Sequence, residues 1–151
     1  MRKTIILIFI AGIFYLPASS QIVIHINAGS RAAYGTYQNL LVDINGQCSY
    51  QRREVNGAVK DSMVFAISKS QLDSIFNKAE QLGFFQLNNR YDGGFADGAG
   101  IMVALNSGGK KKTVDLLNTD VAQINELVAL INRMLQPQNI RIYYGQSSPQ
   151  K

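Results

Sequence analysis

Cysteine, histidine, tryptophan and proline are scarce in this sequence. Its 151 residues include one cysteine, one histidine, three prolines and no tryptophan. A lone cysteine excludes a disulfide framework, and together with a lone histidine it excludes a Cys/His zinc site. Charged residues are also few, at 17% against 46% hydrophobic residues, which excludes a mainly disordered chain. The formal net charge is +5, and without Arg2 and Lys3 of the export signal predicted below it is 5 − 2 = +3, which is too small to indicate a nucleic-acid-binding protein.

The first twenty residues have the features of an export signal. A basic start at residues 1–3 precedes an apolar run from Ile5 to Leu16, and residues 17–20 supply small side chains at the cleavage positions. The run is shorter than the roughly 20 apolar residues of a membrane-spanning helix, although an uncleaved anchor is the alternative. We therefore predict a signal peptide over residues 1–20 and an exported soluble protein, periplasmic or secreted, with no membrane span after cleavage before Gln21.

Alternating residues predict a first strand over residues 22–26, followed by a loop at residues 29–35. Its isoleucines share one face: Ile22, Ile24 and Ile26. His25 lies on the other face, and no neighbouring serine or aspartate arrangement marks it as the base of a catalytic triad. We interpret it as a solvated or hydrogen-bonded histidine.

Residues 37–44 and 47–55 predict a hairpin whose register follows from the hydrophobic pattern. A two-residue loop would place apolar side chains opposite polar ones. A three-residue loop at residues 44–46 instead pairs Val42 with Cys48, so we predict that loop.

The same register pairs Leu40 with Tyr50 and turns Cys48 toward the core, which favours a buried structural thiol over a reactive one. Four residues then share the partly solvated face: Leu41, Asp43, Gln47 and Ser49.

A further strand with alternating Met63, Phe65 and Ile67 leads into a helix. Ser68 followed by Gln71 is typical of a capping box at a helix start. The apolar residues of one helical face follow: Leu72, Ile75, Phe76, Ala79 and Leu82. Gly83 then predicts the helix end, and we interpret Phe84-Phe85 as core.

A second hairpin is predicted around Gly108-Gly109, because a two-residue turn there pairs Val103 with Val114 and Ile101 with Leu116. Lys110-Lys111-Lys112 beside the turn is interpreted as a solvated hairpin tip.

The last helix is predicted to start near residues 118–120 and to end before Pro137. Its apolar stripe is Val121, Ile124, Val128, Ile131 and Leu135. Residues 140–143 predict a short terminal strand, and residues 146–151 a frayed tail.

These elements predict an α+β fold in which two helices pack on one face of an antiparallel sheet, with the other face partly solvated. We expect a single domain over residues 21–145 and a monomer.

Four segments carry a family resemblance: the Val-Asp-Ile-Asn-Gly-Gln hairpin at 42–47, the Leu-Gly-Phe-Phe helix end at 82–85, Arg90-Tyr91, and the Gly-Gly turn and strand at 108–114. The chain resembles a family of small exported bacterial domains of unknown function, found in lipoproteins and periplasmic proteins, over roughly residues 27–136. Many such domains carry a cysteine pair in the opening loop, which this chain lacks at residues 29–36. The resemblance implies no catalytic motif.

The segment 88–100 is the strongest candidate for a functional loop, because long connections in compact domains often carry function. The candidate binding residues are Arg90, Tyr91, Asp92 and Asp97. EF-hand spacing is absent, and Ala99-Gly100 stands where a phosphate-binding loop has Lys-Ser/Thr, so we expect neither metal nor cofactor. A glycine-bent connection with solvated aspartates is the bland alternative.

Because no catalytic set converges, we expect a non-enzymatic module that binds a protein or envelope component through its solvated sheet face or the 88–100 loop. The alternative is a hydrolase in which Asp92 and Asp97 divide the acid and base roles.

Overall fold

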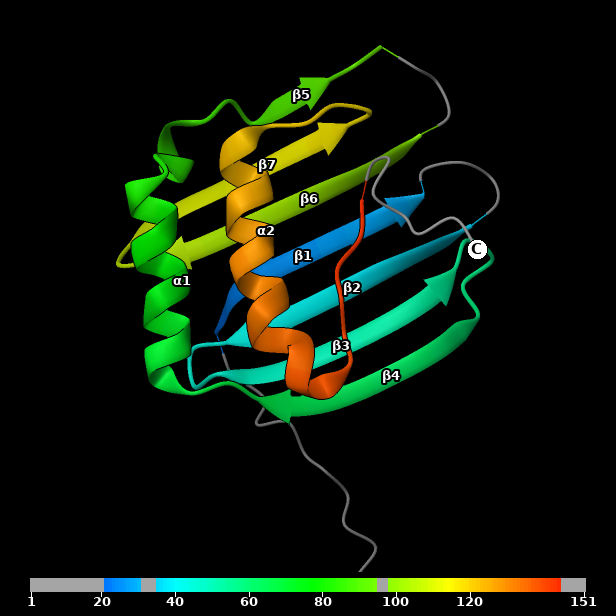
Figure 1. Cartoon of the computed structure of the whole chain (residues 1–151), viewed down its shortest axis with the longest axis horizontal. Coiled ribbons are helices and arrows are strands. Elements are labelled where there is room, and N and C mark those ends of the chain that lie inside the picture. The colour runs from blue at the N-terminus through cyan, green and yellow to red at the C-terminus, as the bar shows by residue number, and fades with distance from the viewer. Residues whose placement is uncertain (1–20, 31–34, 95–97, 145–151) are drawn as a thin grey trace, which may run out of the picture.

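The computed structural model describes residues 21–30, 35–94 and 98–144 (Figure 1). The predicted signal peptide, the predicted tail and Asp97 lie outside the described residues. Among the residues that are described, no helix has the length and apolar character needed to cross a membrane.

Seven strands form one sheet in the order β4-β3-β2-β1-β6-β7-β5. The strand bounds are β1 Ile22–Ser30, β2 Thr36–Asp43, β3 Gln47–Glu54, β4 Val59–Ala66, β5 Arg90–Asp92, β6 Ala99–Ser107 and β7 Lys110–Leu117. The mixed class of strands and helices is confirmed. The sheet is not wholly antiparallel as predicted, because β5 pairs with β7 in parallel.

Two α-helices complete the fold: α1 Lys69–Gln81 and α2 Ala122–Leu135. Short 3-10 turns follow each of them, η1 Phe84–Gln86 and η2 Gln136–Gln138. Both α-helices lie in front of the sheet in Figure 1, side by side and across the strands. We call the sheet surface beneath them the helix face and the opposite surface the open face.

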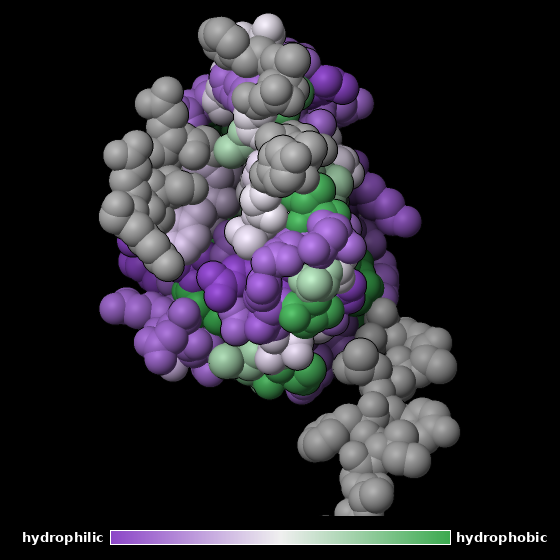
Figure 2. All heavy atoms as spheres, turned by 90° about the vertical axis from the view of Figure 1, so that its right-hand side faces the viewer, coloured by the Kyte–Doolittle hydropathy of each residue, from purple (hydrophilic) through white to green (hydrophobic). Residues whose placement is uncertain are grey.

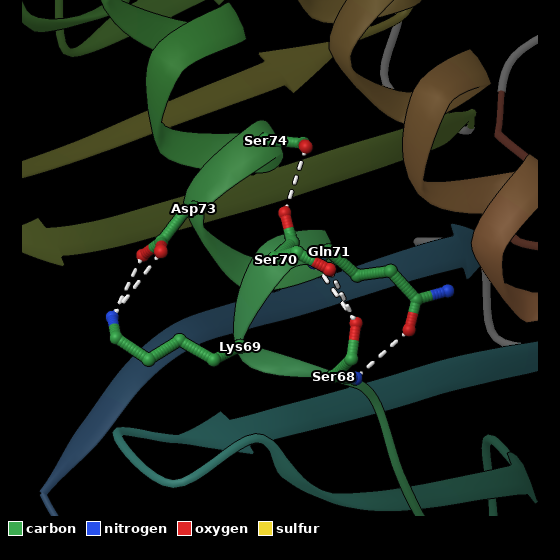
Figure 3. Close-up of polar contacts among 6 residues, drawn as sticks. All are labelled: Ser68, Lys69, Ser70, Gln71, Asp73 and Ser74. Carbon is green, nitrogen blue, oxygen red and sulfur yellow. Dashed lines mark hydrogen bonds and ion pairs between the residues drawn. The ribbon is translucent and has the colours of Figure 1, made fainter.

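The start of α1 is the predicted capping box (Figure 3). The Ser68 hydroxyl accepts a hydrogen bond from the Gln71 N–H at 3.2 Å, and the Gln71 side-chain oxygen accepts one from the Ser68 N–H at 2.8 Å. These bonds satisfy two backbone donors that the first helical turn leaves without partners. At the other end Gly83 has a φ of 66°, a conformation that glycine adopts without steric cost.

Both predicted hairpin registers are confirmed. Val42 pairs with Cys48 across the three-residue loop, and Val103 pairs with Val114 across the glycine turn. In the first loop Gly46 has a φ of 81°, and an added Cβ would lie 2.4 Å from the Ile67 carbonyl oxygen, so both conformation and space require glycine.

One residue of the first hairpin departs from its predicted environment. Asp43 was expected on the solvated face but is only 3% exposed. Its carboxylate accepts hydrogen bonds from the N–H groups of Asn45 and Gln47, each at 2.9 Å. The side chain is therefore buried because it closes the loop that follows it.

The core lies between the helices and the sheet. Its largest fully buried side chains are Phe84, Ile24, Ile26, Leu40, Ile101, Leu105, Leu116, Ile124, Leu127, Leu135, Val103 and Val114. Ile22 was predicted to join Ile24 and Ile26, but it is 41% exposed. An irregularity in the β1–β2 register between Ile22 and Ile24 breaks the alternation at this point.

The predicted strand around Met63 is confirmed as β4, although Met63 is 41% exposed and Val64 64% exposed. As the outermost strand, β4 has a neighbour on one side only, so its apolar side chains have fewer groups to pack against.

Two predictions near the C-terminus need correction. The last helix begins at Ala122, because Asn118 has a φ of 52° and its N–H still bonds to the Ala99 carbonyl at the sheet edge. Residues 140–144 alternate in burial as a strand would, yet they form no strand and run beside α2 across the sheet (Figure 1).

Candidate binding surface

The residues of the open face form rows across the strands, because paired residues on adjacent strands point to the same side of a sheet. The central row crosses all seven strands from β4 to β5: Ser62, Gln51, Asn39, Asn27, Met102, Asp115 and Arg90. Most of its members are half-buried and the two at its ends are exposed. Three neighbouring members, Gln51, Asn39 and Asn27, carry amide groups that can both donate and accept hydrogen bonds.

Rows on either side of this one extend the surface. The first contains Val64, Ser49, Leu41, His25, Ala104 and Thr113. The second contains Arg53, Tyr37, Gly29, Gly100, Leu117 and Asp92. The open face thus carries a mixture of polar, aliphatic and aromatic groups. Neither α-helix covers it.

Hydrogen bonds between neighbouring side chains order part of this surface. The His25 Nε2 and Asn39 Oδ1 atoms are 2.8 Å apart, so His25 is hydrogen-bonded, which is one of the two states that the sequence left open. Arg53 donates from Nε and from one terminal nitrogen to Gln51 Oε1, at 3.0 and 2.8 Å. These contacts hold the side chains in defined positions before any partner binds.

The predicted binding residues divide between the two faces. Arg90 and Asp92 end two of the rows on the open face, and one Arg90 guanidinium nitrogen lies 2.8 Å from Asp92 Oδ2. Tyr91 points to the helix face, where it packs against the core and its hydroxyl accepts a hydrogen bond from the Asn88 N–H at 3.0 Å. The structure thus unites part of the predicted 88–100 loop with the predicted sheet face.

Part of the segment 88–100 is regular where a loop was predicted, since Arg90–Asp92 is a strand. The Gly93 N–H bonds to the Leu117 carbonyl, and the Asp115 N–H to the Asn89 carbonyl. Three residues are too few to show an alternating pattern, which is why the sequence did not reveal this strand.

Both oxygens of the Asp92 carboxylate are engaged. The Gly94 N–H donates to Oδ1 at 2.9 Å and Arg90 to Oδ2. The Gly94 hydrogen bond, and then the Arg90 hydrogen bond and charge, hold the pKa of Asp92 below its usual value. Asp92 therefore stays ionised at neutral pH, which is the state of a binding or structural carboxylate and not of a general acid.

Cys48 is buried, as predicted. It is 1% exposed, and its thiol lies 3.4 Å from the Gly46 carbonyl oxygen. Burial raises the pKa of the thiol to about 11, so it stays protonated at neutral pH. Within the described part of the chain, no three His, Cys, Asp or Glu residues are grouped so as to hold a metal ion.

The basic run at the second hairpin is tied to its surroundings. Lys110 lies 2.8 Å from a Glu80 carboxylate oxygen and 5.6 Å from the centre of the Phe85 ring, while Lys112 donates to the Asn89 side chain. Lys110 and Lys111 are nevertheless exposed, which supports the interpretation of a solvated tip.

Sequence reasoning missed a groove of about 930 Å³ between α2 and residues 139–144. Asn125, Asn132 and Arg133 line it from the helix, and Arg141 and Tyr143 from the terminal segment. The asparagines are spaced by seven residues and so share a helical face, which was the one local signal of a polar groove here. Arg141 and Tyr143 come from a segment whose position depends on tertiary packing.

One end of the molecule faces the viewer in Figure 2, where β1 ends and β2 begins. Its described surface is mostly hydrophilic, with separate small hydrophobic areas. Separate areas of this kind are normal on a protein surface, and the described residues visible at this end form no continuous hydrophobic patch.

No protein of curated function matches this chain. Residues 30–136 match DUF6438, a domain of unknown function, and this range agrees with the resemblance noted over roughly residues 27–136. The matched range contains strands β2 to β7 and both α-helices, and so most of the sheet. The chain belongs to the DUF6438 family of domains of unknown function.

Proposed function

We propose that this protein is an exported, non-enzymatic binding module that contacts a protein or envelope component through its open face. The observation that carries the proposal is the row that crosses all seven strands there. It offers amide, carboxylate and guanidinium groups beside methionine, and part of it is already ordered by hydrogen bonds. A surface that combines rigid polar groups with apolar ones suits recognition of another macromolecule.

Export is supported by the basic start, the short apolar run and the small residues before Gln21. Mass spectrometry of the protein recovered from the periplasm or medium is expected to give an N-terminus near Gln21. An N-terminus at Met1 in a membrane fraction would contradict export as a soluble protein.

A hydrolase would need one carboxyl group that is protonated near neutral pH. Asp92 has a lowered pKa, an ion pair and a backbone hydrogen bond. These features favour a binding role for Asp92, and we propose no acid role for it.

The binding proposal is tested by capture from envelope extract on immobilised mature protein. Asn39→Arg places a long cation in the middle of the open face, and Asn77→Arg makes the same change on the exposed side of α1. Asp92→Ala removes the carboxylate at the edge of the face. We expect Asn39→Arg to reduce the captured partner at least tenfold and Asn77→Arg to retain it. Equal capture by both arginine variants, with both folded, would reject the open face as the binding surface.

A further inference from the structure

The terminal segment, residues 139–144, is held on the molecule by side chains instead of by a neighbouring strand. It runs beside α2 and across the sheet in Figure 1. Asn132 of α2 flanks it on one side and Gln38 of β2 on the other. Both are carboxamides, the side chains that best imitate a backbone peptide group.

Each carboxamide binds the backbone of the segment twice. Asn132 Oδ1 accepts from the Ile142 N–H at 2.7 Å, and its Nδ2 donates to the Ile142 carbonyl at 3.1 Å. Gln38 Oε1 accepts from the Tyr143 N–H at 2.9 Å, and its Nε2 donates to the Arg141 carbonyl at 2.7 Å. Consecutive backbone groups thus bond to opposite sides, as they do in a central β-strand.

These contacts recognise an extended backbone without reading its side chains. The Gln38 carboxamide is prepared for this task, because Gln38 is 6% exposed and its Nε2 also donates to the Tyr50 hydroxyl at 2.8 Å. Specificity comes from alternate side chains of the segment. Ile140, Ile142 and Tyr144 are at most 7% exposed, whereas Arg141 is exposed.

The site and its occupant come from different parts of the chain. Gln38 and Asn132 lie within residues 30–136, the range that the family match covers, whereas residues 139–144 lie outside it. A single turn, η2, joins the segment to α2, and Asn139 after it has a φ of 55°, which is uncommon for a residue other than glycine. The segment therefore has the arrangement of a tethered peptide ligand.

We propose that the space between Asn132 of α2 and Gln38 of β2, which we call the channel, is a peptide-binding site that the terminal segment fills in cis. In trans it takes an extended peptide of a partner protein that has apolar residues at alternate positions. This site lies on the helix face, so the proposal is independent of the open-face function. A tether of a few residues gives the resident segment an effective concentration on the order of millimolar, so an external peptide must outcompete it.

The test weakens the resident segment in the full chain and supplies the same sequence as a separate peptide. Ile140→Ser, Ile142→Ser and Tyr144→Ser together remove its apolar anchors but leave the channel intact. The probe is a fluorescent synthetic peptide with the sequence of residues 138–144, and its binding is measured by fluorescence anisotropy. We expect it to bind this variant at least tenfold more tightly than it binds the wild-type chain.

Two changes separate backbone recognition from nonspecific apolar binding. Adding Asn132→Leu to the weakened variant is expected to reduce peptide affinity at least tenfold, whereas Asn77→Leu on α1 leaves it unchanged. Methylation of the peptide nitrogen at the position of Ile142 is expected to cause a similar loss, since Asn132 then has no N–H to accept. Equal binding of the methylated peptide, or no binding by a folded weakened variant, overturns the proposal.

A measurement on the wild-type chain covers the case in which the weakened variant does not fold. The amides of Ile142 and Tyr143 are expected to exchange with deuterium at least a hundredfold faster than that of Ile131 in α2, because the segment can open by itself. Exchange of all three only through global unfolding would show that the segment is an inseparable part of the core and would overturn the proposal.

Discussion

At the scale of single residues, this molecule uses buried and half-buried polar side chains to bind backbone groups that no strand or helix satisfies. Asp43 bonds two N–H groups of the hairpin loop, and Gln38 and Asn132 bond the terminal segment. A buried backbone group without a partner is costly, so removing one of these side chains destabilises more than its volume suggests.

Asp43→Ala is expected to lower the free energy of unfolding by about 1–3 kcal/mol, because the Asn45 and Gln47 N–H groups lose their acceptor. Urea unfolding measures the change. Asn45→Ala in the same loop is the control, with an expected change within about 0.5 kcal/mol, since Asn45 is exposed. A change for Asp43→Ala no larger than that of the control would contradict the loop-closing role.

Cys48 is expected to make the free energy of unfolding depend on pH in the alkaline range. Burial raises the pKa of its thiol from 9.0 to about 11, so the folded state holds the proton more tightly than the unfolded state. The resulting stabilisation is complete below pH 9 and is lost as the pH rises toward 11, to a total of about 2–3 kcal/mol. Urea unfolding at several pH values from 8 to 10.5 measures this decline.

The matched control for that decline is Cys48→Ala. Burial also raises the pKa of Tyr144, to about 12, but this residue is present in both proteins and its effect cancels in their difference. The stability difference between wild type and Cys48→Ala is expected to shrink steadily above pH 9. A difference independent of pH would show that the thiol does not titrate in this way.

At the scale of elements, the ends of α1 are set by local chemistry that a short stretch of sequence contains. Ser68→Ala is expected to lower stability by about 1 kcal/mol, because the Gln71 N–H loses its acceptor. Ser74 is the control in the same helix (Figure 3), since its hydroxyl only donates back to the Ser70 carbonyl. Thermal unfolding should place Ser74→Ala near wild type, and equal losses for both variants would contradict the cap's role.

At the scale of the whole molecule, apolar side chains buried between the helices and the sheet contribute far more to the free energy of unfolding than the surface ion pairs do. Lys78 of α1 lies 2.7 Å from Glu126 of α2, but Glu126 is exposed to solvent. Glu126→Gln is therefore expected to cost less than about 1 kcal/mol. Ile124 is fully buried, and Ile124→Ala is expected to cost about 2–5 kcal/mol. Denaturant unfolding compares the two, and the reverse order of losses would contradict this account.

Much of the fold could be predicted from the sequence because its signals are local. Both hairpin registers, the capping box and the apolar stripe of α2 involve residues close together in the chain. For the same reason the burial of Cys48 was predictable, whereas the sequence left His25 as either solvated or hydrogen-bonded, because its partner Asn39 lies on the neighbouring strand. The candidate surface was predicted only in outline, since the sequence suggested a sheet face and a loop but not their union.

The amino-acid sequence by itself determined where strands turn, where α1 begins and which face of most strands and helices is apolar, because periodicity and turn chemistry act over a few residues. Only the tertiary structure decided that β5 lies parallel to β7, that Arg90 joins a row crossing the sheet, and that residues 139–144 rest between Asn132 and Gln38. These features depend on contacts between segments far apart in the chain, and no local pattern specifies which distant partner a segment will meet.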